Sequence, residues 1–212
     1  MKYQSTRELV YETALKAKSE GLIYLSAGNF SARTDDGHVA ITPGGLKYEE
    51  MRPEDIVIVD VEANLVDAPR KPSSETPMHT TIYRLLPEIQ GICHTHSSYA
   101  ISFACIGEPI PPLNLELLVC GAPIPVAPWA CPGTAVGGEL IVDLLRQRPE
   151  LRVVLLRNHG LVAATTSLTK ALDLAFDAEM GMKAYHQALQ IGTPVSLNEA
   201  QIAEIYRVYG GF

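Results

Sequence analysis

The chain has 212 residues, of which 47% are hydrophobic and 19% are charged, so its composition is that of an ordinary globular protein and excludes a disordered chain. At about 150 residues per domain, this length predicts one domain with at most a modest extension. Acidic residues outnumber basic ones by 24 to 17, and the formal net charge of -7 disfavours a nucleic-acid partner, which would need a basic surface.

The sequence has no features of a membrane or secreted protein. No apolar run reaches the roughly 18 residues that a membrane span needs, and residues 1–5 do not begin a signal peptide. The cysteine spacings match no zinc ribbon and no CxxC redox motif, so buried free thiols in a reducing cytosol are expected at Cys93, Cys105, Cys120 and Cys131. We therefore expect a cytoplasmic protein without a membrane partner.

The first half of the chain is predicted to form one helix, several short strands and a second helix. Apolar residues at helical spacing predict a helix over residues 5–20, which Gly21 ends. Short apolar runs bounded by Gly and Pro predict strands at residues 39–41, 56–59 and 91–94. Thr76 followed by Pro77 is typical of an N-cap and a first helical position. The helix behind them is expected to bury Met78, Ile82, Leu85 and Leu86.

The second half begins with a proline-rich segment, residues 108–133, that is expected to be mostly loop. The patterns that follow predict a helix, a buried strand and a long helix, at residues 139–148, 153–156 and 169–190. A capping box over residues 196–199 predicts a last short helix, which ends near residues 208–211. No Rossmann or P-loop glycine motif is present. This order predicts an α/β domain with a central mixed or antiparallel sheet covered by helices.

Three of the six histidines form a candidate metal site. His94 and His96 lie at i and i+2 in a predicted strand, so both imidazoles face the same side, about 6–7 Å apart along the backbone. His159 follows the strand at 153–156, and the three converge only if the two strands are neighbours. Three histidines with an open position are typical of a catalytic zinc site. The other three are interpreted as structural or surface residues: His38, His79 and His186.

Three short segments are suited to binding an anion. Residues 26–33 and 41–45 are rich in Gly and small residues, and such turns expose backbone N–H groups. Ser73 and Ser74 precede Glu75 at a predicted helix start, where free N–H groups also favour an anion. The same segments fit ordinary turns and an ordinary acidic helix start. Beside a zinc ion and a phosphate pocket, however, Glu75 could act as a general base.

Five segments in this order resemble the class II aldolase/adducin family, over about residues 9–209. They are Gly28-Asn29-x-Ser31-x-Arg33, Ile41-Thr42-Pro43-x-Gly45, Pro72-Ser73-Ser74-Glu75, His94-x-His96-Ser97 and Asn158-His159-Gly160. The resemblance implies a three-layer α/β/α fold with a mostly antiparallel sheet. It implies a single domain over residues 1–212, in which we expect residues 207–212 to be a flexible tail. It also implies a cytoplasmic homotetramer with active sites between subunits.

The resemblance further implies a set of site residues and a reaction. A divalent ion, Zn²⁺ or alternatively Mn²⁺ or Co²⁺, would be held by His94, His96, His159 and Glu75. A phosphate pocket would be formed by Gly28, Asn29, Thr42, Gly44, Ser73 and Ser74. The implied reaction cleaves a (deoxy)ketose 1-phosphate, such as L-fuculose 1-phosphate, into dihydroxyacetone phosphate and a short aldehyde. Glu75 would move the proton at the carbon of dihydroxyacetone phosphate, and Tyr209 would be the proton donor at the aldehyde oxygen.

Other members of this family are 4-epimerases, dehydratases or decarboxylases of related sugar phosphates. The epimerases that resemble this chain carry Asp at the position of Glu75, and they tend to be longer. Both differences favour an aldolase or a dehydratase. Leu115 and Pro132 replace aromatic residues that fuculose-phosphate aldolases place near the aldehyde, although Trp129 could supply an aromatic wall. Another deoxy-ketose 1-phosphate is therefore an equal alternative. A non-catalytic adducin-like module is disfavoured because all four candidate ligands are present.

Overall fold

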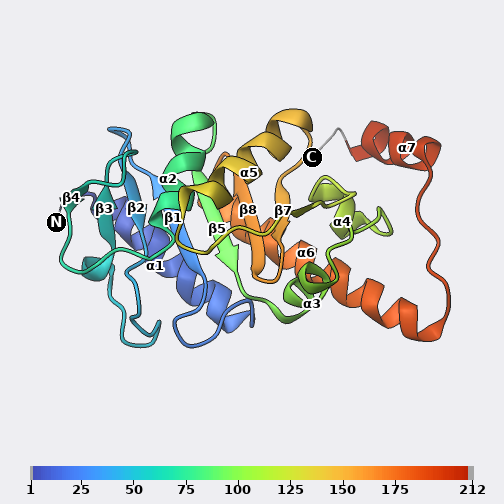
Figure 1. Cartoon of the computed structure of the whole chain (residues 1–212), viewed down its shortest axis with the longest axis horizontal. Helices are drawn as coiled ribbons and strands as arrows, with labels where there is room; N and C mark the ends of the chain where they lie inside the picture. The colour runs from blue at the N-terminus through green and yellow to red at the C-terminus, as the bar shows by residue number, and fades with distance from the viewer. Residues whose placement is uncertain (1, 210–212) are drawn as a thin grey trace.

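The computed structural model describes residues 2–209 and arranges its strands in one sheet, in the order β4-β3-β2-β1-β5-β8-β7-β6 (Figure 1). The strands are β1 (Asn29–Arg33), β2 (Val39–Ile41), β3 (Val57–Val59), β4 (Leu65–Asp67), β5 (Gly91–Thr95), β6 (Val126–Ala127), β7 (Val153–Leu156) and β8 (Gly160–Thr165). Neighbouring strands pair antiparallel, apart from the parallel pair β6 and β7. The predicted mostly antiparallel sheet is confirmed.

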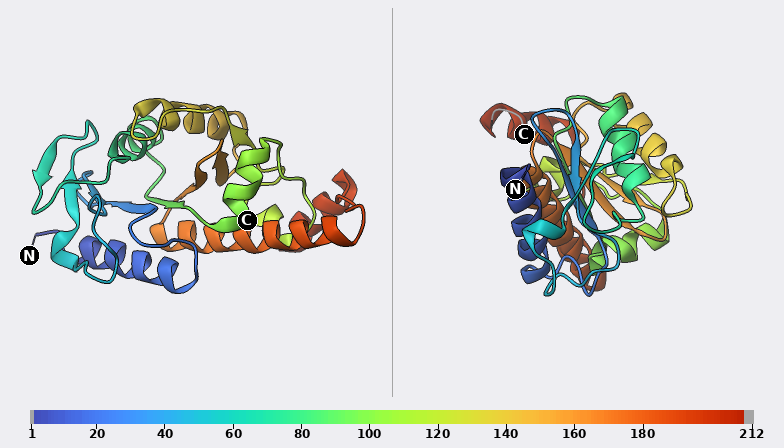
Figure 2. Two further views of the ribbon diagram at one scale, coloured as in Figure 1. Left: turned by 60° about the horizontal axis from the view of Figure 1, so that its bottom comes forward. Right: turned by 90° about the vertical axis from the view of Figure 1, so that its left-hand side faces the viewer.

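Helices cover both faces of the sheet, which gives three layers (Figure 2). On one face α2 and α5 pack against each other and against the sheet, with bounds Thr76–Leu85 and Ala135–Gln147. The other face carries α1 (Gln4–Ser19), α3 (Ser98–Ile106), α4 (Leu115–Val119) and α6 (Leu168–Ile191). A 3-10 turn, η1 (Pro53–Asp55), precedes β3, and α7 (Glu199–Tyr209) follows α6. The predicted α/β/α arrangement is therefore confirmed.

The central strand β5 shows how the sheet separates two apolar cores. Ile92 packs in the cluster that includes α2 and α5, whereas Cys93 packs in the cluster that includes α1 and α6. At the start of the strand, a Cβ on Gly91 would lie 2.1 Å from the backbone nitrogen of Leu168. Only glycine therefore lets the strand approach the first residue of α6 this closely. The first half of β5 is therefore packed tightly on both faces of the sheet.

Two segments that we expected to be irregular are regular elements. The expected turn over residues 26–33 contains β1, whose alternating polar residues are buried and hydrogen-bonded rather than exposed. The expected loop over residues 108–133 contains α4 and β6. The helix predicted at residue 139 begins at Ala135. Gly138 in its first turns obscured the helical pattern, yet it allows close packing, because a Cβ there would lie 2.6 Å from the Met78 carbonyl oxygen.

Helix ends differ from the predictions in their caps. Glu75, not Thr76, is the N-cap residue of α2, because the Thr76 hydroxyl donates back to the Ser73 carbonyl oxygen. At α7 the reciprocal capping bonds join Asn198 and Gln201, so the capping box lies two residues later than predicted. Residues 207–209 of the expected tail form the end of α7, and residues 210–212 lie outside the described part of the chain.

The thiol prediction is correct for two cysteines and wrong for the other two. Cys93 and Cys120 are buried, whereas Cys105 and Cys131 are exposed free thiols. Cys105 lies on the outer side of α3, and Cys131 lies in the loop before α5, so neither packs in a core. Among residues 2–209, no helix has the length and apolar character needed to cross a membrane.

Candidate metal centre and active site

The four predicted ligands, although far apart in the sequence, come together where β5 ends. Their candidate ligand atoms all lie within 4.8 Å of one another, in a cluster of Glu75, His94, His96 and His159. Nε2 of His94 lies 2.9 Å from Oε2 of Glu75 and 3.0 Å from Nε2 of His96. Nε2 of His159 lies 3.5 Å from Oε1 of Glu75. The side chains thus direct their nitrogen and oxygen atoms towards one another.

Strand pairing explains why the histidines meet. His94 lies in β5 and His96 directly follows the end of this strand, and both rings turn to the same side, as the two-residue alternation predicted. The neighbouring strand β8 pairs with β5 in a register that sets His94 opposite Val162, and the turn between β7 and β8 carries His159 to the same end. A Cβ on Gly160 would lie 2.4 Å from the Thr95 carbonyl oxygen. This hairpin can approach the ligands only with glycine at that position.

The protonation of the cluster suits metal binding. Nδ1–H of His94 donates to the carbonyl oxygen of Leu161 at 2.9 Å, and this bond turns its Nε2 into the cluster. Burial, followed by the charges of His94 and His159, lowers the pKa of His96 to about 3. Burial is also the largest cause that lowers the pKa of His159. Both imidazoles are therefore neutral at pH 7 and can coordinate an ion.

Glu75 stays ionised although it is buried. Burial alone would raise its pKa, but the charge and hydrogen bond of His94, the amide of Asn29 and the charge of His159 outweigh this effect and lower the pKa. A carboxylate with three imidazoles is a donor set that suits a borderline divalent ion such as Zn²⁺, Mn²⁺ or Co²⁺. The residues of this structure therefore fit a divalent metal site.

The loops expected to bind phosphate adjoin Glu75. Residues 42–44 run beside residues 71–73, because the N–H of Ser73 donates to the carbonyl oxygen of Thr42 and the N–H of Gly44 to that of Lys71. The Ser73 hydroxyl accepts a bond from the N–H of Glu75, while Ser74 is exposed. The N–H of Gly44 is thus already bonded, and a Cβ there would lie 2.9 Å from the Pro72 carbonyl oxygen, so this glycine allows residues 71–73 to approach closely.

Gly28 and Asn29 connect the expected phosphate pocket to the metal cluster. Gly28 has a φ of +78°, and a Cβ there would lie 2.8 Å from the carbonyl oxygen of His94. Nδ2 of Asn29 donates to Oε2 of Glu75 at 2.9 Å, and Oδ1 lies 2.6 Å from Nε2 of His79. An amide nitrogen carries two hydrogens, so one remains for a substrate oxygen. The bonds of Asn29 to Glu75 and His79 were not expected from the sequence.

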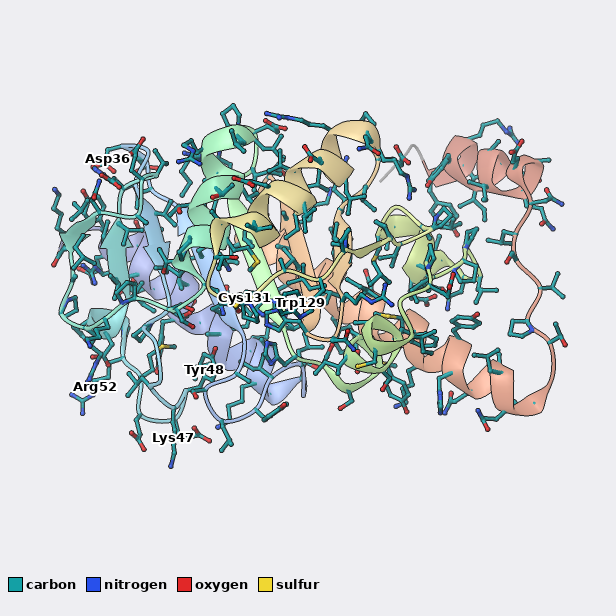
Figure 3. All side chains as sticks on the ribbon, viewed as in Figure 1. Asp36, Lys47, Tyr48, Arg52, Trp129 and Cys131 are labelled. Carbon is teal, nitrogen blue, oxygen red and sulfur yellow. The ribbon has the colours of Figure 1, made fainter. Side chains whose placement is uncertain are left out.

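A pocket that the sequence did not predict opens on the other side of Glu75 and His159. Mainly apolar residues and glycines line it, among them Met78, Pro128, Ala130, Pro132, Gly137 and Leu156. Arg157 and Cys131 also line it, together with Glu75 and His159 of the cluster. The loop that carries Cys131 also carries the exposed Trp129, and Figure 3 shows both over the middle of the sheet.

The structure does not bring Tyr209 into the cluster of its own chain. This residue ends α7, which lies beyond α4 at one end of the molecule, whereas β5 lies near the middle (Figure 1). Its side chain is 60% exposed. A role for Tyr209 at the metal cluster of the same chain would need a large movement of α7.

Comparisons with known proteins agree with this arrangement. A family model described as the Class II Aldolase and Adducin N-terminal domain matches residues 8–186. A 5-deoxy-D-ribulose 1-phosphate aldolase from Bacillus thuringiensis is 33% identical over 100% of this chain and 99% of its own. A 5-methylthioribulose-1-phosphate/5-deoxyribulose-1-phosphate aldolase from Rhodospirillum rubrum is 34% identical over 96% and 92%. A solved structure of an L-fuculose 1-phosphate aldolase matches with a TM-score of 0.91 and 30% identity, covering 99% and 98%.

Proposed function

The chain belongs to the class II aldolase and adducin family, and from this premise we propose that it is a metal-dependent aldolase acting on a ketose 1-phosphate. The products would be dihydroxyacetone phosphate and a short aldehyde. The convergence of Glu75 with three histidines is the observation that carries the proposal. It would place a divalent ion beside a carboxylate, as the reaction requires.

We propose Zn²⁺ as the ion, with Mn²⁺ or Co²⁺ as alternatives, held by His94, His96, His159 and Glu75. Such an ion supplies a Lewis acid for the carbonyl oxygen of the sugar. In cleavage, the C3–C4 bond breaks, the C4 hydroxyl loses a proton and C3 gains one. Glu75, ionised and buried, would hold and move the proton at C3. Tyr209 would exchange the proton at the aldehyde oxygen.

The strand order supports one direction for the substrate. The proposed phosphate residues lie at the β1 and β2 side of the cluster, namely Gly28, Asn29, Thr42, Gly44, Ser73 and Ser74. The apolar pocket lies at the β7 and β6 side, where Leu156 ends β7 and Pro128 follows β6. The sugar would lie between them, with its phosphate over β1 and β2. Its far end would face apolar side chains, which favours a deoxy sugar that ends in a methyl or methylthio group.

We also propose a cytoplasmic homotetramer in which each subunit is one domain, residues 1–212, without a nucleic-acid or membrane partner. The place of α7 supports active sites at subunit interfaces, since Tyr209 lies away from the cluster of its own chain. In an assembly it would reach the cluster of a neighbouring subunit. The four free cysteines fit a reducing compartment.

An assay of the metal-loaded protein on a panel of sugar phosphates tests the proposed reaction. The panel contains 5-deoxyribulose 1-phosphate, L-fuculose 1-phosphate, ribulose 5-phosphate and methylthioribulose 1-phosphate, and the assay couples detection to dihydroxyacetone phosphate. We expect its release from a deoxy-ketose 1-phosphate. If no substrate releases dihydroxyacetone phosphate, the aldolase proposal fails. Epimerisation of ribulose 5-phosphate would then indicate an epimerase, and dehydration of methylthioribulose 1-phosphate would indicate a dehydratase.

A further inference from the structure

A buried chain of hydrogen bonds leads from Glu75 through Asn29 into the protein interior, and the proposed reaction gives its inner members no role. Asn29 bonds Glu75, and His79 on α2 bonds Asn29 through Nε2. On the other side of the ring, Nδ1 of His79 lies 2.6 Å from the hydroxyl of Ser31, which lies 3.0 Å from the hydroxyl of Tyr83. The side chain of His79 is fully buried, and both of its ring nitrogens are bonded.

The chemistry of Glu75 sets the direction of each bond. An ionised carboxylate only accepts hydrogen bonds, so Asn29 must turn its amide nitrogen to Glu75 and its oxygen to His79. The Asn29 oxygen accepts as well, and Nε2 of His79 must therefore carry the proton. In the neutral ring with its proton on Nε2, Nδ1 is the acceptor for the Ser31 hydroxyl, which lies 2.6 Å away. One tautomer of His79 satisfies the bonds from Glu75 to Ser31, and the Tyr83 hydroxyl donates to the Ser31 carbonyl oxygen.

The orientation of Asn29 depends on that tautomer. Without a donor at the position of Nε2, the Asn29 oxygen would face a lone pair or an empty site. The amide could then flip and turn its oxygen towards the carboxylate of Glu75, where the two acceptors repel each other. A side chain that merely filled this interior position would be apolar, because a buried ring nitrogen costs stability unless it is paired. The position therefore requires a donor aimed at Asn29.

We propose that His79 is a positioning residue, whose Nε2–H holds the Asn29 amide so that it donates to Glu75 and orients this carboxylate for the metal. The role of the oriented carboxylate in turnover rests on the proposed function, whereas its orientation towards the metal does not. Residues that orient metal ligands in this way typically change metal affinity or activity about 10-fold to 100-fold when replaced.

Two variants separate the two sides of the ring. The amide of Gln in His79→Gln reaches the position of Nε2 and can still donate to Asn29. The shorter amide in His79→Asn reaches only the position of Nδ1, so it bonds Ser31 and leaves Asn29 unsupported. We expect His79→Asn to weaken Co²⁺ binding, measured by chelator competition, about 10-fold to 100-fold and to lower kcat similarly. His79→Gln should recover most of both.

Thr80→Val is the matched control on the same helix. Its hydroxyl is also buried but donates to the carbonyl oxygen of Thr76, so its loss tests general damage to α2. We expect this variant to keep both Co²⁺ affinity and kcat. Equal losses in His79→Gln and His79→Asn, or in Thr80→Val and His79→Asn, would overturn the proposal, because packing alone would then explain the effect.

A double-mutant cycle tests whether His79 acts through Asn29. In the Asn29→Ala background, His79→Asn should weaken Co²⁺ binding no further, because the amide that His79 holds is gone. The same loss in both backgrounds would contradict the proposal. Co²⁺ binding tests the role of His79 even if the wild-type protein cleaves no sugar phosphate. A lack of cleavage would refute the proposed function but not the role of His79.

A measurement on the wild-type protein needs no variant. Nitrogen-15 NMR of the histidine rings distinguishes the two neutral tautomers from each other and from the imidazolium. For His79 at pH 7, we expect a protonated Nε2 and an unprotonated Nδ1. The opposite tautomer would leave no proton on the Asn29 side of the ring, and a charged ring would leave no acceptor on the Ser31 side. Either result would overturn the proposal.

Discussion

At the scale of single residues, Glu75 combines two properties that usually exclude each other. Its side chain is buried, which favours a neutral carboxylic acid, yet the pKa is lowered because His94, Asn29 and His159 stabilise the charged form. The carboxylate is therefore ionised beside the proposed metal ion, which is the state that a base or a metal ligand requires. Its N–H also bonds the Ser73 hydroxyl, which fixes the start of α2 under the site.

Replacing Glu75 by glutamine tests its role as a base. Glu75→Gln keeps the size and polarity of the side chain but removes the charge and the proton acceptor. We expect the fold to persist and kcat to fall about 100-fold or more, the usual contribution of a general base. The control is Glu88→Gln at an exposed position, which should leave kcat unchanged. Turnover of Glu75→Gln within a few-fold of wild type would remove this residue from the base role.

The thiols differ in reactivity because they differ in burial. Burial raises the pKa of Cys93 and, with smaller effects of Asp177 and Glu116, that of Cys120. Cys131 is exposed and lines the apolar pocket. At pH 8 we expect iodoacetamide to label Cys131 but neither buried thiol, and mass spectrometry of peptides measures this.

The same labelling tests the proposed pocket. An acetamide group on Cys131 would occupy space where the end of the sugar should lie, so activity should fall as labelling proceeds. Cys131→Ser should be active and resist this inactivation. Full activity of a protein labelled at Cys131 would show that the pocket does not receive the substrate.

Among the helices and strands, β5, which positions two of the proposed ligands, was predicted more accurately than the neighbouring elements were. A His-x-His pair in an apolar run implies that both rings share a face, whatever the neighbouring strands are. That His159 joins them depends on the pairing of β5 with β8, which no local pattern reveals. β1 was mistaken for a turn, because Asn29 and Ser31 are polar residues that face a buried network.

The apolar pocket could not be predicted for a similar reason. Its wall combines α2, the loop before α5 and the end of β7, which meet only in the folded protein. The glycines at the start of α5 hid the helix from its sequence pattern. In the structure they allow α5 to lie close to α2, since a Cβ on Gly138 would also come within 2.8 Å of Thr81.

The hairpin between β7 and β8 gives a prediction at this scale. Gly160→Ala would place a Cβ 2.4 Å from the Thr95 carbonyl oxygen and 3.3 Å from the His94 ring. The hairpin must then shift and carry His159 away, so we expect loss of bound metal. Gly192→Ala, where a Cβ meets nothing within 4 Å, is the control. The metal content of both purified variants is measured. A full metal content in Gly160→Ala would show that the hairpin does not need glycine at this position to place His159.

At the scale of the whole molecule, the net charge of -7 at first disfavours a phosphate ester as substrate. The proposed site does not depend on that charge, because its donors are backbone N–H groups, hydroxyls and an amide near a helix start, together with a metal ion. Such local donors act over a few ångströms, whereas the net charge is spread over the surface.

The proposed assembly predicts that subunits complement one another. If Tyr209 serves the cluster of a neighbouring subunit, Tyr209→Phe and His94→Ala are each inactive for different reasons. Mixed tetramers of the two variants would then contain some sites with both residues intact. We expect partial activity after the two proteins are unfolded and refolded together, and none when each is refolded alone. If mixed tetramers recover no activity, Tyr209 does not act at the metal cluster of a neighbouring subunit.

The most direct test of the central claim is the release of dihydroxyacetone phosphate from 5-deoxyribulose 1-phosphate by the wild-type protein before and after metal removal. We expect cleavage by the metal-loaded protein, its loss after chelation and dialysis, and its return when Zn²⁺, Mn²⁺ or Co²⁺ is added. His94→Ala should bind less metal and should not recover. Cleavage that persists without metal, or that metal restores equally to His94→Ala, would contradict this claim.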